Sequence, residues 1–242
     1  MKRIFDIFFS IIAIFIISPL LIILIILWIK NKNSPFYIAN RVGQYGKNFK
    51  MIKIRTMVIN ADKSGIDSTS EDDKRITKTG RILRKFKLDE LTQFINILKG
   101  DMSFVGPRPN IRREIDIYTN EEKKLLNLKP GLTDFASIVF SDESKILNGK
   151  TDPDIAYNQL IRPGKSKLGL FYLKKNNFLV DLVLIILTLS SIFSRRFSLR
   201  LIQSLLIKLN ASNEILQIAA RRKTLMPSPP PGAINIVKTR NK

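Results

Sequence analysis

The chain has 242 residues, a length that suits one domain with appendages and can bury a hydrophobic core. It contains no Cys and no His, which excludes disulfides, zinc sites built on these residues, and catalytic pairs of Ser or Cys with His. Lys and Arg number 41 against 20 Asp and Glu, a net charge of +21 that favours a polyanion or an anionic membrane surface as partner.

A run of 23 residues without a charge, Ile7 to Ile29, lies near the N-terminus. A straight helix of this length would measure about 34 Å, which is enough to cross a bilayer core of about 30 Å. The run is too long for the apolar region of a cleaved signal peptide, and no small-x-small cleavage site follows it. It therefore predicts a membrane helix.

Ser18 and Pro19 stand in the middle of this run. Pro19 has no backbone N–H, and its ring collides with the carbonyl of Phe15, so a kink is expected. The Ser18 hydroxyl can bond back to a nearby carbonyl and offset part of that loss. A helix broken here has arms of about 18 and 16 Å, each close to one leaflet of the bilayer core.

Basic residues flank the run on both sides, with Lys2 and Arg3 before it and Lys30 and Lys32 after it. This distribution favours keeping both ends on the cytoplasmic side. Two topologies fit the residues equally well. One is a re-entrant hairpin that dips into the membrane and returns, and the other is a kinked single span, because Pro is common in membrane helices.

From residue 33 onward the chain is typical of a soluble domain. Residues 36–38 and 49–54 are predicted strands, and residues 43–46 supply a turn. Near the end of the second strand, the period of two places Lys53 and Arg55 on one face. Two adjacent cations suit a phosphate group, whereas the alternative is a solvated strand face.

After a polar surface loop at residues 61–73, four apolar residues at helical spacing predict a helix that ends at Gly100: Leu91, Phe94, Ile95 and Leu98. Asp89 and Glu90 begin this helix, just after a basic cluster that includes Arg84. One interpretation is a helix cap and a favourable N-terminal charge. The other is a pair of carboxylates in a basic setting, where Asp89 stays ionised and can attack an electrophile or hold a metal. The residues alone favour the cap.

Gly106-Pro107-Arg108-Pro109 constrains its backbone strongly, because each Pro fixes its own φ and pushes the preceding residue into extended geometry. A guanidinium held between two such constraints is a good bidentate phosphate ligand, which makes Arg108 a candidate. The alternative is a stiff turn without a ligand.

Two apolar segments follow in the C-terminal third. Residues 178–193 are strongly apolar but too short to span a membrane, and residues 197–209 mix Leu and Ile with basic residues. They predict core helices or helices that lie in the membrane interface. After Glu214 the chain has no acidic residue and is rich in Pro, which predicts an unfolded basic tail. Such a tail either binds anionic lipid or is simply disordered.

The order of motifs resembles the bacterial sugar transferase family, the monotopic polyprenyl-phosphate phosphoglycosyl transferases. The resemblance covers about residues 2–190, and its most specific part runs from Leu88 to Pro109. The matching stretches are Lys2-Arg3-Ile4-Phe5-Asp6, Ser18-Pro19, Asn40-Arg41-Val42-Gly43, Lys53-Ile54-Arg55-Thr56-Met57, Arg75-Ile76-Thr77 with Gly80, Leu88-Asp89-Glu90-Leu91-Thr92-Gln93, Asn96-Ile97-Leu98-Lys99-Gly100-Asp101-Met102-Ser103, Val105-Gly106-Pro107-Arg108-Pro109, Lys129-Pro130-Gly131-Leu132-Thr133, and Tyr172 with Asp181.

The resemblance implies transfer of a phosphosugar from a nucleotide sugar, usually a UDP-sugar, to undecaprenyl phosphate with release of UMP, a reaction that initiates polysaccharide or glycoconjugate assembly. It implies that Asp89 is the nucleophile that forms a covalent phosphosugar intermediate, that Glu90 acts with it, and that both serve Mg²⁺. Lys53, Arg55, Arg84 and Arg108 are the expected phosphate ligands.

The resemblance also decides the topology in favour of a re-entrant hairpin broken at Ser18-Pro19. The expected fold is α/β, mostly helical with a small β-hairpin: a membrane hairpin at residues 1–34, a catalytic domain with interfacial helices at residues 35–195, and an amphipathic helix with a basic, Pro-rich tail at residues 196–242. The domain is expected on the cytoplasmic face of the bacterial inner membrane. The sequence leaves open whether the protein forms a homodimer.

Four positions depart from the family pattern: Asn40, Thr92, Asp134 and Gly169. They bear on recognition of the nucleotide or sugar and leave the reaction class intact. The competing hypothesis is a non-enzymatic, membrane-tethered basic protein that binds nucleic acid or anionic lipid. Nucleic acid is not expected as a partner, because the aromatic residues are not interleaved with the basic clusters.

Overall fold

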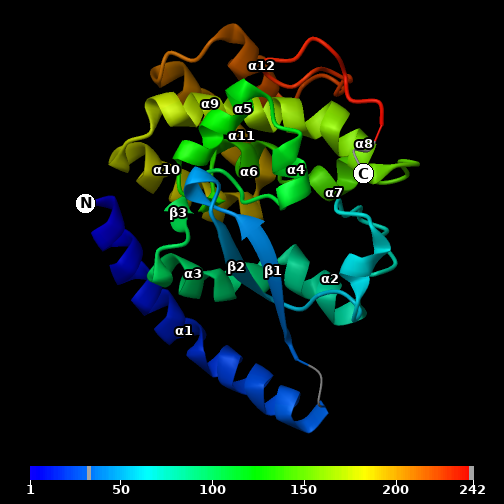
Figure 1. The fold of residues 1–242 in the computed structure, drawn as a ribbon. Coiled ribbons are helices and arrows are strands. Elements are labelled where there is room, and N and C mark those ends of the chain that lie inside the picture. Colours follow the sequence, from blue (N-terminus) through cyan, green and yellow to red (C-terminus); the bar gives the residue numbers. More distant parts are fainter. Residues whose placement is uncertain (32–33, 240–242) are drawn as a thin grey trace.

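The computed structural model describes residues 1–31 and 34–239, with the backbone alone for residues 27–31 (Figure 1). Lys30, Lys32 and the last three residues of the basic tail are therefore outside the described side chains. The first half of the described chain contains α1 (Lys2–Asn31), β1 (Phe36–Val42), β2 (Asn48–Ile54), α2 (Lys78–Lys85), a 3₁₀ helix (Leu88–Gln93), α3 (Phe94–Lys99), β3 (Ser103–Val105), α4 (Arg112–Asp116) and α5 (Asn120–Lys123). The second half contains β4 (Gly131–Thr133), α6 (Phe135–Val139), α7 (Glu143–Ile146), α8 (Pro153–Ala156), a π-helical turn (Tyr157–Ile161), α9 (Arg162–Lys175), α10 (Phe178–Phe193), α11 (Arg195–Lys208) and α12 (Asn213–Ala220).

The predicted β-hairpin is confirmed. β1 and β2 pair antiparallel, with Phe36 opposite Ile54 and Val42 opposite Asn48. A short parallel pair, β3 with β4, was not predicted, because each strand has only three residues and the two are distant in the sequence. The fold is mostly helical with small sheets, as expected.

The expected break at Ser18-Pro19 does not divide the membrane helix in two. α1 is one helix with Pro19 inside it, although Figure 1 shows that it bends along its length. The Ser18 hydroxyl donates to the Phe15 carbonyl at 2.7 Å. This is the acceptor that Pro19 leaves without its usual backbone donor, so the hydroxyl repairs the lost bond and the helix continues.

The start of α1 is attached to the rest of the molecule. The Lys2 ammonium lies 2.8 Å from the Asp181 carboxylate and donates to the Val105 carbonyl at 2.9 Å. Arg3 donates to two carbonyls at the end of α3, at 2.5 and 2.8 Å. The Asp6 carboxylate accepts a backbone N–H of β3 at 3.2 Å. The first turns of α1 are therefore packed against the part of the molecule that contains α3, β3 and α10.

Among the described residues, α1 is the one helix long and apolar enough to cross a membrane, and most of its surface is exposed. α10 is shorter and has two apolar faces. One face packs inside through Leu184 and Leu187. The other is exposed and comprises Leu179, Val183, Ile186, Leu189, Ile192 and Phe193. Phe5 of α1 packs edge-on against Phe178, with ring centroids 5.4 Å apart, so these two apolar helices begin side by side.

The main hydrophobic core lies between α6, α9, α10, α11 and α12, with Phe135, Leu168 and Ile202 fully buried. Residues 221–239, the described part of the chain after the last helix, have no helix or strand, as their prolines predict, but the expectation that they are unfolded is wrong. Pro230 is buried, and Thr119 donates to the Pro231 carbonyl at 2.5 Å. Figure 1 shows this tail lying over the upper helices.

Candidate functional site

A cleft of about 430 Å³ collects all six residues predicted as substrate or metal ligands: Lys53, Arg55, Arg84, Asp89, Glu90 and Arg108. They come from the end of β2, from α2, from the 3₁₀ helix and from the loop after β3. The fold thus brings four separate chain segments to one hollow, as a common site requires.

The 3₁₀ helix that carries the two carboxylates is fixed to β2 by polar side chains. The Thr92 hydroxyl donates to the Ile52 carbonyl at 2.9 Å. The Asn96 side chain accepts the Ile52 N–H at 3.0 Å and donates to the Lys50 carbonyl at 2.7 Å. Both side chains are buried, so these bonds satisfy the edge of the strand and hold the helix in register with it. Thr92, a departure from the family pattern, is thus part of the scaffold.

Asp89 is buried, with 7% of its surface exposed. It is not a helix cap, because the N-cap residue is Lys87 in the left-handed region at φ 55°, so that interpretation is wrong. Among the described residues the Asp89 carboxylate makes no hydrogen bond and no ion pair within 4 Å. Burial raises its pKa, and the positive charges of Lys53 and Arg84 oppose part of that rise. Asp89 therefore lines the cleft as a carboxylate that accepts no hydrogen bond from the described residues.

Glu90 has the opposite environment. Its Oε1 accepts from Arg108 at 2.6 Å and from Lys53 at 3.0 Å. Burial alone would raise its pKa, but these two cations hold the pKa of Glu90 well below its usual range. The same carboxylate raises the pKa of Arg108. The two cations thus favour the ionised form of Glu90, and Glu90 in turn positions both of them in the cleft.

Arg108 is held by backbone that has no room for side chains. A Cβ on Gly106 would lie 2.1 Å from the Lys129 carbonyl oxygen, and one on Gly131 would lie 2.1 Å from the Gly106 nitrogen. The Gly131 N–H donates to the Pro107 carbonyl at 3.0 Å. The two Gly-containing motifs are thus pressed together, and glycine is required at both because any side chain would collide with backbone. The predicted stiff turn at Gly106–Pro109 is therefore confirmed, and Arg108, which it carries, lines the cleft.

The other two predicted arginines are partly occupied by neighbours. Arg55 donates to the carbonyls of Ser34 and Phe36, each at 3.0 Å, and so ties down the chain that leaves α1. Arg84 donates to the Thr56 hydroxyl at 2.9 Å. Both guanidinium groups still line the cleft.

Sequence reasoning missed several residues that line the same cleft. Arg41 and Lys87 add positive charge, while Glu114, Tyr157 and Lys165 form another part of the lining. Arg41 stands in a family motif and Lys87 lies two residues before Asp89, so each had a signal. Glu114 and Tyr157 had none, because only the fold brings them to the cleft.

Glu114 should make stability depend on pH. Burial, with repulsion from Asp67 and Glu143 and weaker attraction to Lys165, raises the pKa of Glu114 from 4.5 to about 7. Between pH 4.5 and 7 the folded state therefore holds a proton that the unfolded chain has lost, so stability falls as pH rises through this window. The loss is at most about 3.5 kcal/mol, at about 1.4 kcal/mol per pH unit.

Glu114→Gln should remove this dependence. Thermal melting in detergent should show the variant more stable than the wild type at pH 8 and equal to it near pH 4.5. Glu121→Gln, at an exposed position, is the matched control and should leave the profile unchanged. Parallel melting profiles for Glu114→Gln and the wild type would contradict the assigned proton.

Two of the other three departures from the family pattern, Asp134 and Gly169, have a structural role. Asp134 caps α6 by accepting the Ser137 N–H at 2.7 Å and its hydroxyl at 2.6 Å. Gly169 lies against Leu125, since a Cβ there would stand 2.9 Å from a Leu125 methyl carbon. Asn40 is exposed on β1.

Comparison with known proteins agrees with the geometry. Residues 1–195 match the family described as bacterial sugar transferase. An uncharacterized sugar transferase, EpsL of Bacillus subtilis, is 33% identical over 193 residues, which are 79% of this chain and 87% of the relative. The exopolysaccharide production protein ExoY of Sinorhizobium fredii is 32% identical over 213 residues, or 81% of this chain and 87% of the relative.

A third relative is the undecaprenyl-phosphate galactose phosphotransferase of Salmonella typhimurium. It is 39% identical over 148 residues, which cover 55% of this chain and 31% of the relative. The chain belongs to the bacterial sugar transferase family, as its motifs predict, and is therefore an enzyme of the sugar transferase class. The competing hypothesis of a non-enzymatic basic protein is set aside.

Proposed function

We propose that this enzyme transfers a phosphosugar from a UDP-sugar to undecaprenyl phosphate, and so begins the assembly of an exopolysaccharide or a related glycan. One observation carries the proposal: Asp89, a buried carboxylate without a hydrogen-bond partner among the described residues, lies on a cleft lined by cations. The names of relatives support the choice of acceptor, since several are undecaprenyl-phosphate sugar phosphotransferases.

The reaction takes place in two displacements. In the first, an Asp89 carboxylate oxygen attacks the phosphorus that bears the sugar, the bridging P–O bond breaks, and UMP leaves with the electron pair. In the second, a phosphate oxygen of undecaprenyl phosphate attacks the same phosphorus, and the bond to Asp89 breaks. The product is undecaprenyl diphosphate sugar, and the carboxylate is restored. Dividing the reaction lets two bulky substrates use one site in turn.

The cations of the cleft make the first step feasible. A carboxylate that approaches a diphosphate meets electrostatic repulsion, and phosphoryl transfer depends mainly on positioning and charge neutralisation. Glu90 holds Lys53 and Arg108 in place before substrate arrives. Preorganised charge of this kind needs no rearrangement during the reaction. Absence of His is no obstacle, because the nucleophile is already an anion.

Asp89 and Glu90 would hold Mg²⁺. The described residues contain no cluster of three or more acidic side chains for a metal, but Mg²⁺ commonly takes one or two carboxylates and completes its shell with phosphate oxygens and water. The unpartnered Asp89 carboxylate and Oε2 of Glu90, whose Oε1 accepts both cations, fit this requirement. The bound metal would neutralise charge on the diphosphate.

The attachment of α1 supports a re-entrant topology on the cytoplasmic face of the inner membrane. Lys2, Arg3 and Asp6 contact the body that contains the cleft, and the chain after α1 enters the same body at β1. A straight crossing would place these two attachments on opposite sides of the bilayer. The exposed apolar faces of α1 and α10 suit burial in lipid, which would place the cleft where a lipid phosphate arrives.

The proposal is tested by incubating purified protein with undecaprenyl phosphate, Mg²⁺ and each of a panel of UDP-sugars. UMP should appear with at least one donor, only when the metal is present. Release of UDP with the whole panel would indicate direct sugar transfer and contradict the proposal, as would absence of turnover with every donor.

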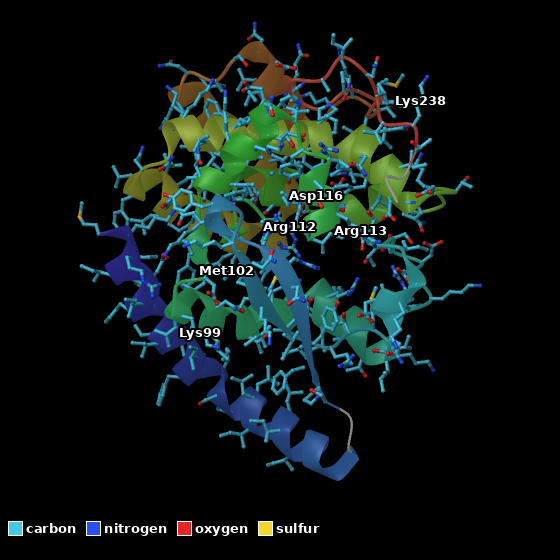
Figure 2. All side chains as sticks on the ribbon, in the orientation of Figure 1. Lys99, Met102, Arg112, Arg113, Asp116 and Lys238 are labelled. Atoms are coloured by element: carbon cyan, nitrogen blue, oxygen red, sulfur yellow. The ribbon has the colours of Figure 1, made fainter. Side chains whose placement is uncertain are left out.

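The topology makes a separate prediction. Ile4→Cys and Lys99→Cys each place one thiol on a chain without cysteine, the first at the start of α1 and the second on the exposed end of α3 (Figure 2). In intact spheroplasts, both should resist a membrane-impermeant maleimide and react only after permeabilisation. Labelling of residue 4 in intact spheroplasts, with residue 99 protected, would overturn the re-entrant topology.

Changing Ser18 and Pro19 together to Ala should weaken the proposed re-entrant topology of α1. The substitution restores the backbone bond to Phe15 and removes a steric cost of about 3 kcal/mol. The straightened run of about 34 Å can then cross the bilayer, while its basic flanks still oppose crossing. Residue 4 should therefore become partly accessible from outside, and transfer activity should fall.

A further inference from the structure

The segment after the family match, residues 196–239, is here called the C-terminal extension. Its helices are part of the main core. Ile202 and Leu206 of α11 are fully buried, as is Ala219 of α12. Ser198 at the start of the extension shares a hydrogen bond of 2.6 Å with Ser190 of α10. The extension is therefore packed as firmly as the matched residues that it covers.

The extension forms an ion pair with Asp142, which lies between residues that line one wall of the cleft. This carboxylate lies 2.9 Å from Arg195, the last matched residue, and 3.0 Å from Arg221, which follows α12. The Arg221 guanidinium also stacks over the Phe140 ring, 4.9 Å from its centroid. Phe140 and Glu143, on either side of Asp142, line the cleft. Two arginines thus hold Asp142, which lies in the chain between Phe140 and Glu143 of the cleft lining.

A second set of contacts joins the extension to the π-helical turn. The Gln159 carbonyl accepts the Ser228 N–H at 3.1 Å, and the Gln159 side chain donates to the Val237 carbonyl at 2.6 Å. Tyr157, two residues earlier in the same turn, lines the cleft. Figure 2 labels Lys238, the residue after Val237, near the end of the described tail. The tail is therefore attached to a second segment that lines the cleft.

We infer that the C-terminal extension is a brace that positions the cleft wall formed by Phe140, Glu143 and Tyr157 for binding of the nucleotide-sugar donor. The extension contacts both backbone segments that carry this wall. One contact is the ion pair of Arg221 with Asp142, and the other is the pair of hydrogen bonds between the tail and Gln159. Arg221 is a positioning residue, because it contacts the wall from behind and does not line the cleft. The role in donor binding rests on the proposed function, whereas the mechanical role does not.

Hydrogen exchange measured by mass spectrometry on the full-length protein in detergent tests the mechanical role. Arg221→Met should raise exchange in residues 135–146 roughly ten-fold, the effect of losing one charged hydrogen bond, and leave residues 88–99 unchanged. Arg222→Met, at the exposed neighbouring position, is the control and should change neither. Deleting residues 224–242 should raise exchange in residues 153–161. Unchanged exchange in both altered proteins would overturn the brace.

Steady-state kinetics with the UDP-sugar that the wild type uses best tests the role in donor binding. Arg221→Met should raise KM for the donor about ten-fold with kcat within about two-fold, and Arg221→Lys should recover part of the loss. A fall in kcat that follows the melting temperature, with KM unchanged, would assign Arg221 to stability alone and overturn the positioning role. Absence of turnover by the wild type with every donor would contradict the proposed function, while the exchange result would still judge the brace.

Discussion

Asp89→Asn should abolish phosphosugar transfer, with a loss of at least about 10³-fold in kcat, because a neutral amide cannot attack phosphorus. The substitution keeps the shape of the side chain, and Asp89 makes no hydrogen bond among the described residues that Asn would lose. Burial raises the pKa of Asp89, so the ionised carboxylate is a cost to the folded state. The variant should therefore melt at or slightly above the wild-type temperature. UMP release and thermal melting measure the two effects.

Two further variants show whether the loss is specific. Asp62→Asn removes a carboxylate from an exposed position that also lines the cleft, and it should keep activity within about two-fold of the wild type. Glu90→Gln should be severely impaired by a different route, because it releases Arg108 and Lys53 from their shared anion. Full turnover by Asp89→Asn would remove Asp89 from the chemistry.

Arg108→Lys should lose about 10- to 100-fold in kcat/KM, although it keeps the charge. A guanidinium is a planar fork that can hold Glu90 and a phosphate oxygen together, and the stiff turn from Gly106 to Pro109 fixes its direction. An ammonium on a flexible stem can replace the charge but not that geometry. Steady-state kinetics with saturating Mg²⁺ measures the loss.

The matched control is Arg112→Lys. Arg112 lies four residues further on, at the start of α4 (Figure 2), and donates to the Gly46 carbonyl and the Asn48 side chain, each at 2.7 Å. It does not line the cleft, so this variant should retain activity. If Lys at 108 works as well as Arg, the Pro-Arg-Pro segment is a turn without a role in phosphate binding.

Local patterns in the sequence predicted much of the fold. Strand residues around turn residues 43–46 predicted the β-hairpin, and Gly100, at φ 93°, ends the helix where it was expected to do so. The apolar run predicted α1. These features depend on neighbours in the chain, which is why periodicity and turn chemistry find them. The six cleft residues were predicted as a common site only through the family resemblance, because the residues alone favoured a helix cap at Asp89.

Other features depend on contacts between distant segments. The apolar stripe of Leu91, Phe94, Ile95 and Leu98 suggests the buried face of a helix, yet the most buried residues of that segment include Thr92 and Asn96, which bond to β2. The segment contacts β2 through Thr92 and Asn96, so these polar residues, and not the apolar stripe, face the strand. A helical pattern shows that two faces differ, but it does not show which partner covers each face.

The different environments of the two acidic residues were also out of reach of sequence reasoning. Asp89 and Glu90 are adjacent and chemically alike, but only Glu90 meets Arg108 and Lys53. That difference arises from the close approach of Gly106 and Gly131, which sets the direction of Arg108. The folded tail was likewise missed, because composition reports the absence of helix and strand and not the hydrogen bonds that a Pro-rich segment makes with a surface.

The central claim is that Asp89 becomes covalently attached to the phosphosugar. Purified protein should be mixed with Mg²⁺ and the UDP-sugar that supports turnover, without undecaprenyl phosphate, then quenched and measured by intact-mass spectrometry and peptide mapping. We predict a mass increase of one phosphosugar, carried by the peptide that contains Asp89, absent from Asp89→Asn, and removed when undecaprenyl phosphate is added before quenching. An unmodified Asp89 peptide in protein that turns over only when both substrates are present together would contradict the two-step mechanism.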